Sequence, residues 1–175
     1  MKSYLGWHAN EEEKVTRSCD QKRYHYSTGN DHWLGNGTYF FEDSPEGNGK
    51  LHAESWNYKQ SHSNPAAFKA DISVNEENLI DLEDEETLML VNKLKDRYLT
   101  RMLQFNKKPK NGYIDGFFYN MWDSCIKRKK IDLIRRQDYY QTKSDQLLQI
   151  RSRTPNVYVL CVRNKECISN PKRCY

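Results

Sequence analysis

The feature that most constrains the fold of this chain is a glycine turn that runs directly into an aromatic strand. Gly35-Asn36-Gly37 breaks the backbone, and Thr38-Tyr39-Phe40-Phe41 follows with β-branched and aromatic residues. Glycine tolerates positive φ and leaves room for a ligand beside the backbone, and the run after it predicts a buried strand. Two interpretations are open. The aromatics form the floor of a site for a flat ligand, or they belong to a hairpin and fill a core, since Asn-Gly turns are common in hairpins.

The composition predicts one domain, residues 1–175, with a polar, hydrated surface and an aromatic-rich core. Charged residues make up 30% and hydrophobic residues 37%, and the mean hydropathy of −1.01 is polar for a globular protein. Aromatic residues at 13%, together with several apolar runs, argue against a disordered chain. The net charge of +4 is compatible with an anionic partner but does not demand one.

The N-terminal residues MKSYLGWHAN lack the apolar core of a signal peptide, and no stretch approaches the roughly 18 apolar residues of a membrane span. We therefore expect a cytoplasmic protein with no membrane partner. The five cysteines, Cys19, Cys125, Cys161, Cys167 and Cys174, are then expected to be reduced. The last three are spaced six and seven apart, which fits no common zinc motif, so no metal site is expected.

Short apolar runs alternate with amphipathic segments, and this mixture predicts one α+β domain. Strands are expected at 3–9, 66–74, 79–82, 131–134 and 157–162, and the last should be buried on both faces because it has almost no polar alternation. Helices are expected at 10–23, 50–62 and 83–105, and the segment 137–149 is expected to be irregular. In the third helix a predicted core stripe contains Leu88, Val91, Leu94, Tyr98 and Met102.

Four strings along the chain form an ordered set. Gly6 to Asn10 reads GWHAN, His32 to Glu42 carries HxWLGxGxYFFE, Ala53 to Trp56 reads AESW, and Leu160 to Asn164 reads LCVRN. In this order they resemble motifs of small prokaryotic ADP-ribosyltransferase-like proteins of the poly(ADP-ribose) polymerase-type superfamily. The resemblance spans most of the chain, and the second string is the most specific.

The resemblance implies a split β-sandwich with flanking helices, and a crevice that holds NAD+ as a substrate. By position, His8 corresponds to the histidine that hydrogen-bonds the adenosine-side ribose, and Tyr39 to the tyrosine that stacks on the nicotinamide. The residues expected around the dinucleotide are His8, Ala9, His32, Trp33, Gly35, Gly37, Thr38 and Tyr39. Cleavage of the nicotinamide bond builds positive charge on the ribose, which fixed dipoles stabilise.

The chain departs from the family pattern at two places. Ala9-Asn10 stands where the family has Gly-Thr, and no Glu occurs between Asp138 and Glu166, where a third catalytic Glu should precede the last predicted strand. Gln149 is the preferred candidate for this third catalytic position, ahead of Gln146, with Asp145 behind both. A Gln can hydrogen-bond a ribose hydroxyl but cannot act as a general base. Transfer of a single ADP-ribose to an acceptor that needs little deprotonation is therefore favoured over polymer formation.

Several other polar residues allow two interpretations each. His32 could face the ligand or only close the turn, and His25 and His52 are expected to be structural or exposed. Arg135 follows a predicted strand and could meet an anion, although a surface position is the simpler expectation. Three basic clusters could line a path for RNA or DNA or could be solvated faces: Arg17/Lys22/Arg23, Lys107/Lys108/Lys110 and Lys127/Arg128/Lys129/Lys130.

The hypothesis that follows is an NAD+-dependent mono-ADP-ribosyltransferase, of the kind used as bacterial toxins or antiphage effectors. A nucleic-acid acceptor is preferred over a protein acceptor because of the basic surface, and an antitoxin protein is a further partner to test for. Two alternatives remain. One is a catalytically silent module that binds NAD+, ADP-ribose or RNA, and the other is an NAD+ glycohydrolase that labels no macromolecule.

Overall fold

The computed structural model describes the chain except residues 30–31, 46–47, 107–114, 126–129, 153 and 175, and it describes residues 123–125 by backbone alone. The basic cluster at 107–110 and three of the four residues of the cluster at 127–130 therefore lie outside the described residues.

The strands are β1 (Lys2–Glu11), β2 (Thr38–Glu42), β3 (Pro65–Val74), β4 (Leu79–Asp81), β5 (Leu133–Asp138), β6 (Val157–Val162) and β7 (Ile168–Cys174). The helices are α1 (Glu12–Gln21), α2 (Gly49–Lys59), α3 (Glu85–Gln104), α4 (Asp115–Cys125) and α5 (Lys143–Leu147), with 3₁₀ turns at Glu76–Asn78 and Lys165–Cys167. The α+β class is confirmed.

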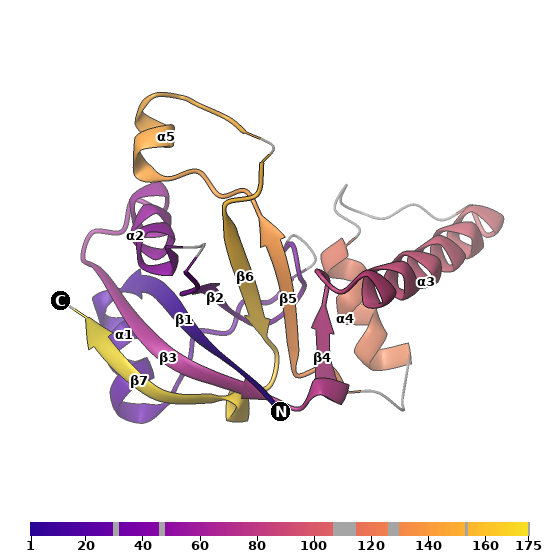
Figure 1. Ribbon diagram of the computed structural model, residues 1–175, viewed down its shortest axis with the longest axis horizontal. Helices are drawn as coiled ribbons and strands as arrows, with labels where there is room; N and C mark the ends of the chain where they lie inside the picture. Colours follow the sequence, from indigo (N-terminus) through magenta and orange to yellow (C-terminus); the bar gives the residue numbers. More distant parts are fainter. Residues whose placement is uncertain (30–31, 46–47, 107–114, 126–129, 153, 175) are drawn as a thin grey trace.

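Within the described residues the strands form one mixed sheet of seven, in the order β4-β5-β6-β2-β1-β3-β7 (Figure 1). Only the β4–β5 pair is parallel among the pairings of this sheet. Figure 1 shows α3 and α4 grouped beside β4, at one end of the molecule, whereas α1 and α2 lie near β1 and β3. No helix in the described part of the chain combines the length and the apolar composition needed to cross a membrane.

The sheet opens between its two central strands. β1 and β2 are paired in register through Gly6↔Glu42 and Trp7↔Phe41. Beyond that point β1 continues in register with β3 as far as Glu11↔Pro65, while β2 continues with β6 as far as Thr38↔Val162. The two halves of the sheet therefore separate from His8 onward, on the side where β1 ends and β2 begins.

Alternation along the strands divides the core into two faces. In β5, Leu133 packs in a cluster with Phe40 and Phe68, and its neighbour Ile134 packs in a second cluster on the opposite face. In β6, Leu160 belongs to the first cluster and Cys161 to the second. Val157–Val162 is almost fully buried, as its continuous apolar run predicts. Its two faces are covered because helices pack against both sides of the sheet.

The helix predictions at the start of the chain and in the middle are confirmed within a few residues. The first helix starts later than expected, since β1 runs on to Glu11 and α1 begins at Glu12. Two acids stand in the first turn of α1, where the positive end of the helix dipole favours them. The side chain of Asn48 accepts a hydrogen bond from the backbone N–H of Leu51 and so caps α2.

Three expectations are corrected by the structure. The segment 137–149 is partly regular: β5 extends to Asp138, and Thr142 with Asp145 forms a capping box that starts α5. The predicted core stripe of α3 is only partly buried, since Val91 is buried while Leu88 is 39% exposed. Leu94 and Tyr98 of the same stripe are partly buried and pack against the core. β7 and α4 were not predicted, because ISNPKRC carries a proline and charges, and the glycine in DGFFYNMWDSC obscures its helical pattern.

Candidate functional site

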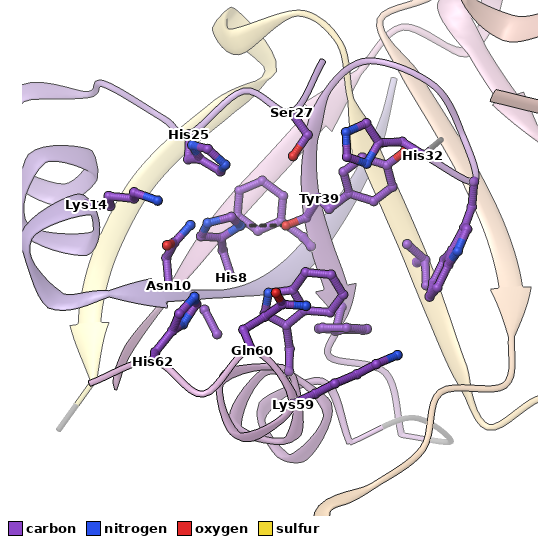
Figure 2. Close-up of a pocket in the computed structure, with 16 residues that line it drawn as sticks. His8, Asn10, Lys14, His25, Ser27, His32, Tyr39, Lys59, Gln60 and His62 are labelled. Carbon is purple, nitrogen blue, oxygen red and sulfur yellow. Dashed lines mark hydrogen bonds between the residues drawn. The ribbon is translucent and has the colours of Figure 1, made fainter. Parts of the chain in front are cut away.

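A cavity of about 420 Å³ lies at the opening between β1 and β2 (Figure 2). The strands contribute His8, Ala9 and Asn10 from β1 and Tyr39, Phe40 and Phe41 from β2. Its volume is within the range of sites for small organic ligands, about 300–1,000 Å³. Of the predicted site residues, His8, Ala9, His32, Trp33 and Tyr39 line it together.

His8 is a buried polar group in the wall of this cavity, with 8% of its surface exposed. Its Nδ1 atom lies 2.7 Å from the backbone carbonyl oxygen of Tyr39 (Figure 2, dashed line). A carbonyl oxygen can only accept, so Nδ1 carries the proton and donates. Burial lowers the pKa of His8 to about 4, so the ring is neutral at pH 7 and Nε2 has a bare lone pair. No described residue hydrogen-bonds this buried Nε2 atom.

The ring of His8 is held in place by two phenylalanines. Its centroid lies 5.5 Å from that of Phe40 and 5.3 Å from that of Phe68. Phe40 and Phe68 are buried and pack edge to face. This apolar support explains both the low pKa of the imidazole and its fixed orientation.

The side chain of Tyr39 projects from β2 on the face of the sheet opposite to that of Phe40. It reaches the cavity because β1 and β2 have separated there. Its hydroxyl donates to the carbonyl oxygen of Gly35 at 2.6 Å and accepts from the N–H of Leu34 at 3.1 Å. Burial raises the pKa of this phenol far above its usual range. The ring of His32 lies 6.0 Å from the ring of Tyr39, centroid to centroid, and both are drawn at the same wall in Figure 2. Tyr39 thus braces the loop before it while its ring faces the cavity.

The glycines of the turn have packing roles and do not line the cavity. Gly35 has a positive φ of 80°. At Gly37 a Cβ atom would lie 2.5 Å from Sγ of Cys161. Gly37 and Ser27 exchange two backbone hydrogen bonds that close the loop between them. Gly35, Gly37 and Thr38 were predicted to touch the ligand, but they lie behind the wall and shape the loop that carries His32 and Trp33.

Helix α4 fixes this loop from behind. Asn120 accepts a hydrogen bond from the N–H of Asn36 at 2.6 Å and donates to the carbonyl oxygen of Gly29 at 3.0 Å. A Cβ atom on Gly116 would lie 1.8 Å from the carbonyl oxygen of His32, so only glycine allows this approach. Two residues of a helix more than 80 positions away therefore hold both ends of the loop in place.

One side of the cavity is polar and cationic. Figure 2 shows Lys14, His25 and His62 around His8 and Asn10 on this side. Burial is the main cause of the lowered pKa of His25, and the nearby Lys14 lowers it further. Among the described residues that line the cavity, none is Asp or Glu. This side can therefore accept an anionic group without repulsion.

The other side is aromatic. Trp33, Phe41 and Trp56 line the cavity and pack on buried Tyr140, whose ring centroid lies 6.1, 5.2 and 5.8 Å from theirs. Lys59 also lines the cavity, and its Nζ lies 5.2 Å from the Tyr140 centroid. The aromatic strand after the glycine turn therefore contributes both to the core, through Phe40, and to the wall of a ligand site, through Tyr39 and Phe41. A flat heterocycle is well matched to such walls.

Gln149 does not lie with these residues at the cavity. It is exposed, has a positive φ of 55° just after α5, and does not line the cavity. Gln146, the second choice, is occupied by the carbonyl oxygens of Ser55 and Gln141. The polar lining residues that were not predicted are Lys14, Asn10, His25, Ser27, Lys59, Gln60 and His62. Only Asn10, beside His8, and Lys59, one turn after Trp56, stand near enough to a motif for the sequence to have indicated them.

Arg135 belongs to a buried ion network and not to the cavity or the surface. Its Nε donates to Glu42 at 2.6 Å and its Nη1 to Asp81 at 3.3 Å. Its guanidinium carbon lies 3.9 Å from the centroid of the Tyr158 ring. The arginine therefore joins β5 to β4 and β2 across the sheet.

No group of three or more potential metal ligands occurs among the described residues. Among the described residues, Cys19, Cys161, Cys167 and Cys174 form no disulfide bond. His52, expected to be structural or exposed, is buried and packs against Tyr140 and Phe41.

Comparison of the chain with models of protein families, with curated proteins and with solved structures found no match.

Proposed function

We propose that this chain is an NAD+-dependent mono-ADP-ribosyltransferase and that the dinucleotide binds in the cavity between β1 and β2. The observation that carries the proposal is the neutral ring of His8, whose buried Nε2 has no partner among the described residues. A buried acceptor without a donor is costly. A ribose hydroxyl is a suitable donor for it.

The rest of the lining suits the other parts of NAD+. Lys14, on the polar side, supplies positive charge for a diphosphate, and Tyr39 with Trp33 supplies aromatic surface for a planar base. The division of the sheet between β1 and β2 is the arrangement expected of a split sandwich with a crevice. These features, together with the quoted motifs, favour the ADP-ribosyltransferase fold.

The reaction would replace nicotinamide at C1′ of its ribose by a nucleophilic acceptor. Positive charge grows on the ribose as the bond breaks, and hydroxyl or carbonyl dipoles that are already in place stabilise it without reorganising. The basic composition favours a nucleic-acid acceptor over a protein. A role as a toxin or antiphage effector, with an antitoxin as partner, is part of the same proposal.

Labelled NAD+ tests this function directly. The protein is incubated with NAD+ carrying a labelled adenosine and with cell extract, and the products are digested separately with nuclease and with protease. Label released by nuclease supports a nucleic-acid acceptor, and label released by protease supports a protein acceptor. Nicotinamide release without macromolecular label would identify a glycohydrolase, and absence of NAD+ binding in calorimetry would refute the proposal.

A silent binding module is the second candidate. It is favoured by one observation, namely that no carboxylate stands among the described lining residues. Such a module would bind NAD+ or ADP-ribose in calorimetry and release no nicotinamide. The two functions are thus separated by one measurement on the same sample.

A further inference from the structure

The tautomer of the neutral His32 ring, like that of His8, follows from a hydrogen bond to a backbone carbonyl oxygen. The Nε2 atom of His32 lies 3.2 Å from the backbone carbonyl oxygen of Thr28. Because the carbonyl oxygen can only accept, Nε2 is the nitrogen that carries the proton in the neutral ring. The second nitrogen, Nδ1, is then an unprotonated base on a residue that lines the cavity.

The loop that carries His32 is held tightly enough to aim this ring. Asn120 bonds to both ends of the loop, and the backbone of Gly116 lies against the carbonyl oxygen of His32 itself. The hydroxyl of Tyr39 hydrogen-bonds Leu34 and Gly35, two and three residues after His32. A positioned base needs this kind of support, since misplacement by about 1 Å can cost a factor of about 100 in rate.

We propose that His32 is the general base of the reaction and that the acceptor is a neutral hydroxyl group. This inference rests on the transferase function proposed above. The described lining residues include no carboxylate, and Gln149 lies elsewhere. The free nitrogen of His8 is buried and is assigned to the substrate ribose by the proposed function, whereas His32 is half-buried and lines the cavity. His32 also adjoins the Tyr39 ring, where the nicotinamide end of the substrate is placed by the proposed function.

The step balances with the groups present. Nδ1 of His32 takes the proton of the acceptor O–H, and the oxygen forms a bond to C1′ of the nicotinamide ribose. The C1′–N bond breaks, and its electron pair leaves with nicotinamide, which becomes neutral. The proton passes from His32 to solvent before the next turnover. The products are an O-linked ADP-ribose and nicotinamide, and no further reactant is needed.

The test compares two small nucleophiles, one of which needs a base and one of which does not. Methanol is a neutral hydroxyl and must lose a proton, whereas azide is already an anion. Nicotinamide release and the two ADP-ribose adducts are measured with saturating NAD+ for the wild-type protein and for His32→Ala. Methanol transfer should fall about 100-fold or more in His32→Ala while azide transfer changes by less than about threefold.

Imidazole in solution provides a second readout. Added imidazole should restore methanol transfer in His32→Ala and should not accelerate the wild-type protein. His25→Ala is the matched control, because His25 also lines the cavity but should leave the ratio of the two transfers unchanged. His32→Gln, which keeps a donor for Thr28, replaces His32→Ala if the latter fails to fold.

Equal loss of both transfers would overturn the inference, since it would place His32 in NAD+ binding or loop support. Unchanged methanol transfer would overturn it as well. A wild-type protein that binds NAD+ but cleaves it with neither nucleophile would refute the proposed transferase itself. The two failures are therefore distinguishable.

Discussion

The Nδ1 atom of His8 lies 2.7 Å from the carbonyl oxygen of Tyr39, so that a side chain of β1 bonds to the main chain of β2 just where the two strands separate. The bond closes the inner end of the cavity and determines which nitrogen of His8 is free. It also connects the first motif of the sequence to the second. The predictions below begin from this contact.

Replacement of His8 by alanine should weaken NAD+ binding without unfolding the protein. The loss of one hydrogen bond to a buried neutral acceptor amounts to about 0.5–1.5 kcal/mol, which is about 3- to 10-fold in Kd. Calorimetric titration with NAD+ measures the change, and far-UV circular dichroism checks the fold. His62→Ala serves as the control, because His62 lines the cavity but its Nδ1 is already paired with Asn57. Equal weakening in both variants would contradict the special role of His8.

Stability should fall as the pH drops below about 6.5, in part because of His8. Its pKa is about 4 in the folded protein and about 6.5 in the unfolded chain. The neutral ring therefore contributes its full stability above pH 6.5, and this contribution is lost between pH 6.5 and about 4, at up to about 1.4 kcal/mol per pH unit. Urea denaturation across this range should give a shallower decline for His8→Gln. The slope will not vanish, because burial also lowers the pKa of His25 and His52. An identical slope in the variant would refute the assignment.

Two substitutions of Tyr39 should separate its ring from its hydroxyl. Tyr39→Ala should abolish transfer, because the aromatic wall is lost. Tyr39→Phe keeps the ring but loses the bonds to Leu34 and Gly35, so it should cost about 1–3 kcal/mol of stability and leave measurable transfer. Label incorporation from NAD+ and thermal denaturation follow the two effects. Normal labelling by Tyr39→Ala would exclude this residue from the site.

Asn120→Ala should loosen the loop that carries His32 and Trp33 although Asn120 does not line the cavity. The variant removes the acceptor for the N–H of Asn36, so this amide should exchange with solvent faster in hydrogen–deuterium exchange. Transfer should fall in parallel. Asn92→Ala, on the outer surface of α3, is the control and should change neither. Slow exchange at Asn36 in the variant would show that the loop does not depend on α4.

Arg135→Ala should be the most destabilising of the single substitutions discussed. It leaves the carboxylates of Glu42 and Asp81 buried without their cation, which costs about 3–5 kcal/mol. Arg136→Ala is the matched control, because Arg136 is 39% exposed and its ion pair with Asp115 is worth about 0–1 kcal/mol. Chemical denaturation of both variants measures the difference. Similar losses would mean that solvent reaches the Arg135 network.

Much of the architecture was predictable because it depends on local patterns. The apolar run at 157–162 became β6, and the alternation at 66–74 became β3. The predictions failed where the pattern was ambiguous. The edge strand β7 needs no buried alternation, and the capping box that starts α5 lies in a segment whose composition is that of a loop. Short regular elements of this kind are stabilised by their neighbours more than by their own composition.

The candidate site was likewise predictable from the sequence only in part. The resemblance of the quoted motifs to a known family implied His8, Tyr39, His32 and Trp33 as site residues, and these four line the cavity. The sequence could not reveal that Gly35 and Gly37 serve the packing of the loop, nor that Gln149 does not line the cavity. Spacing along the chain says nothing about which side chains converge from separate elements. The placement of Lys14 and His25 beside His8, the anchoring of the loop by Asn120 and the free nitrogen of His8 arise only when the strands part and the helices pack around them. Tertiary structure alone therefore decided them.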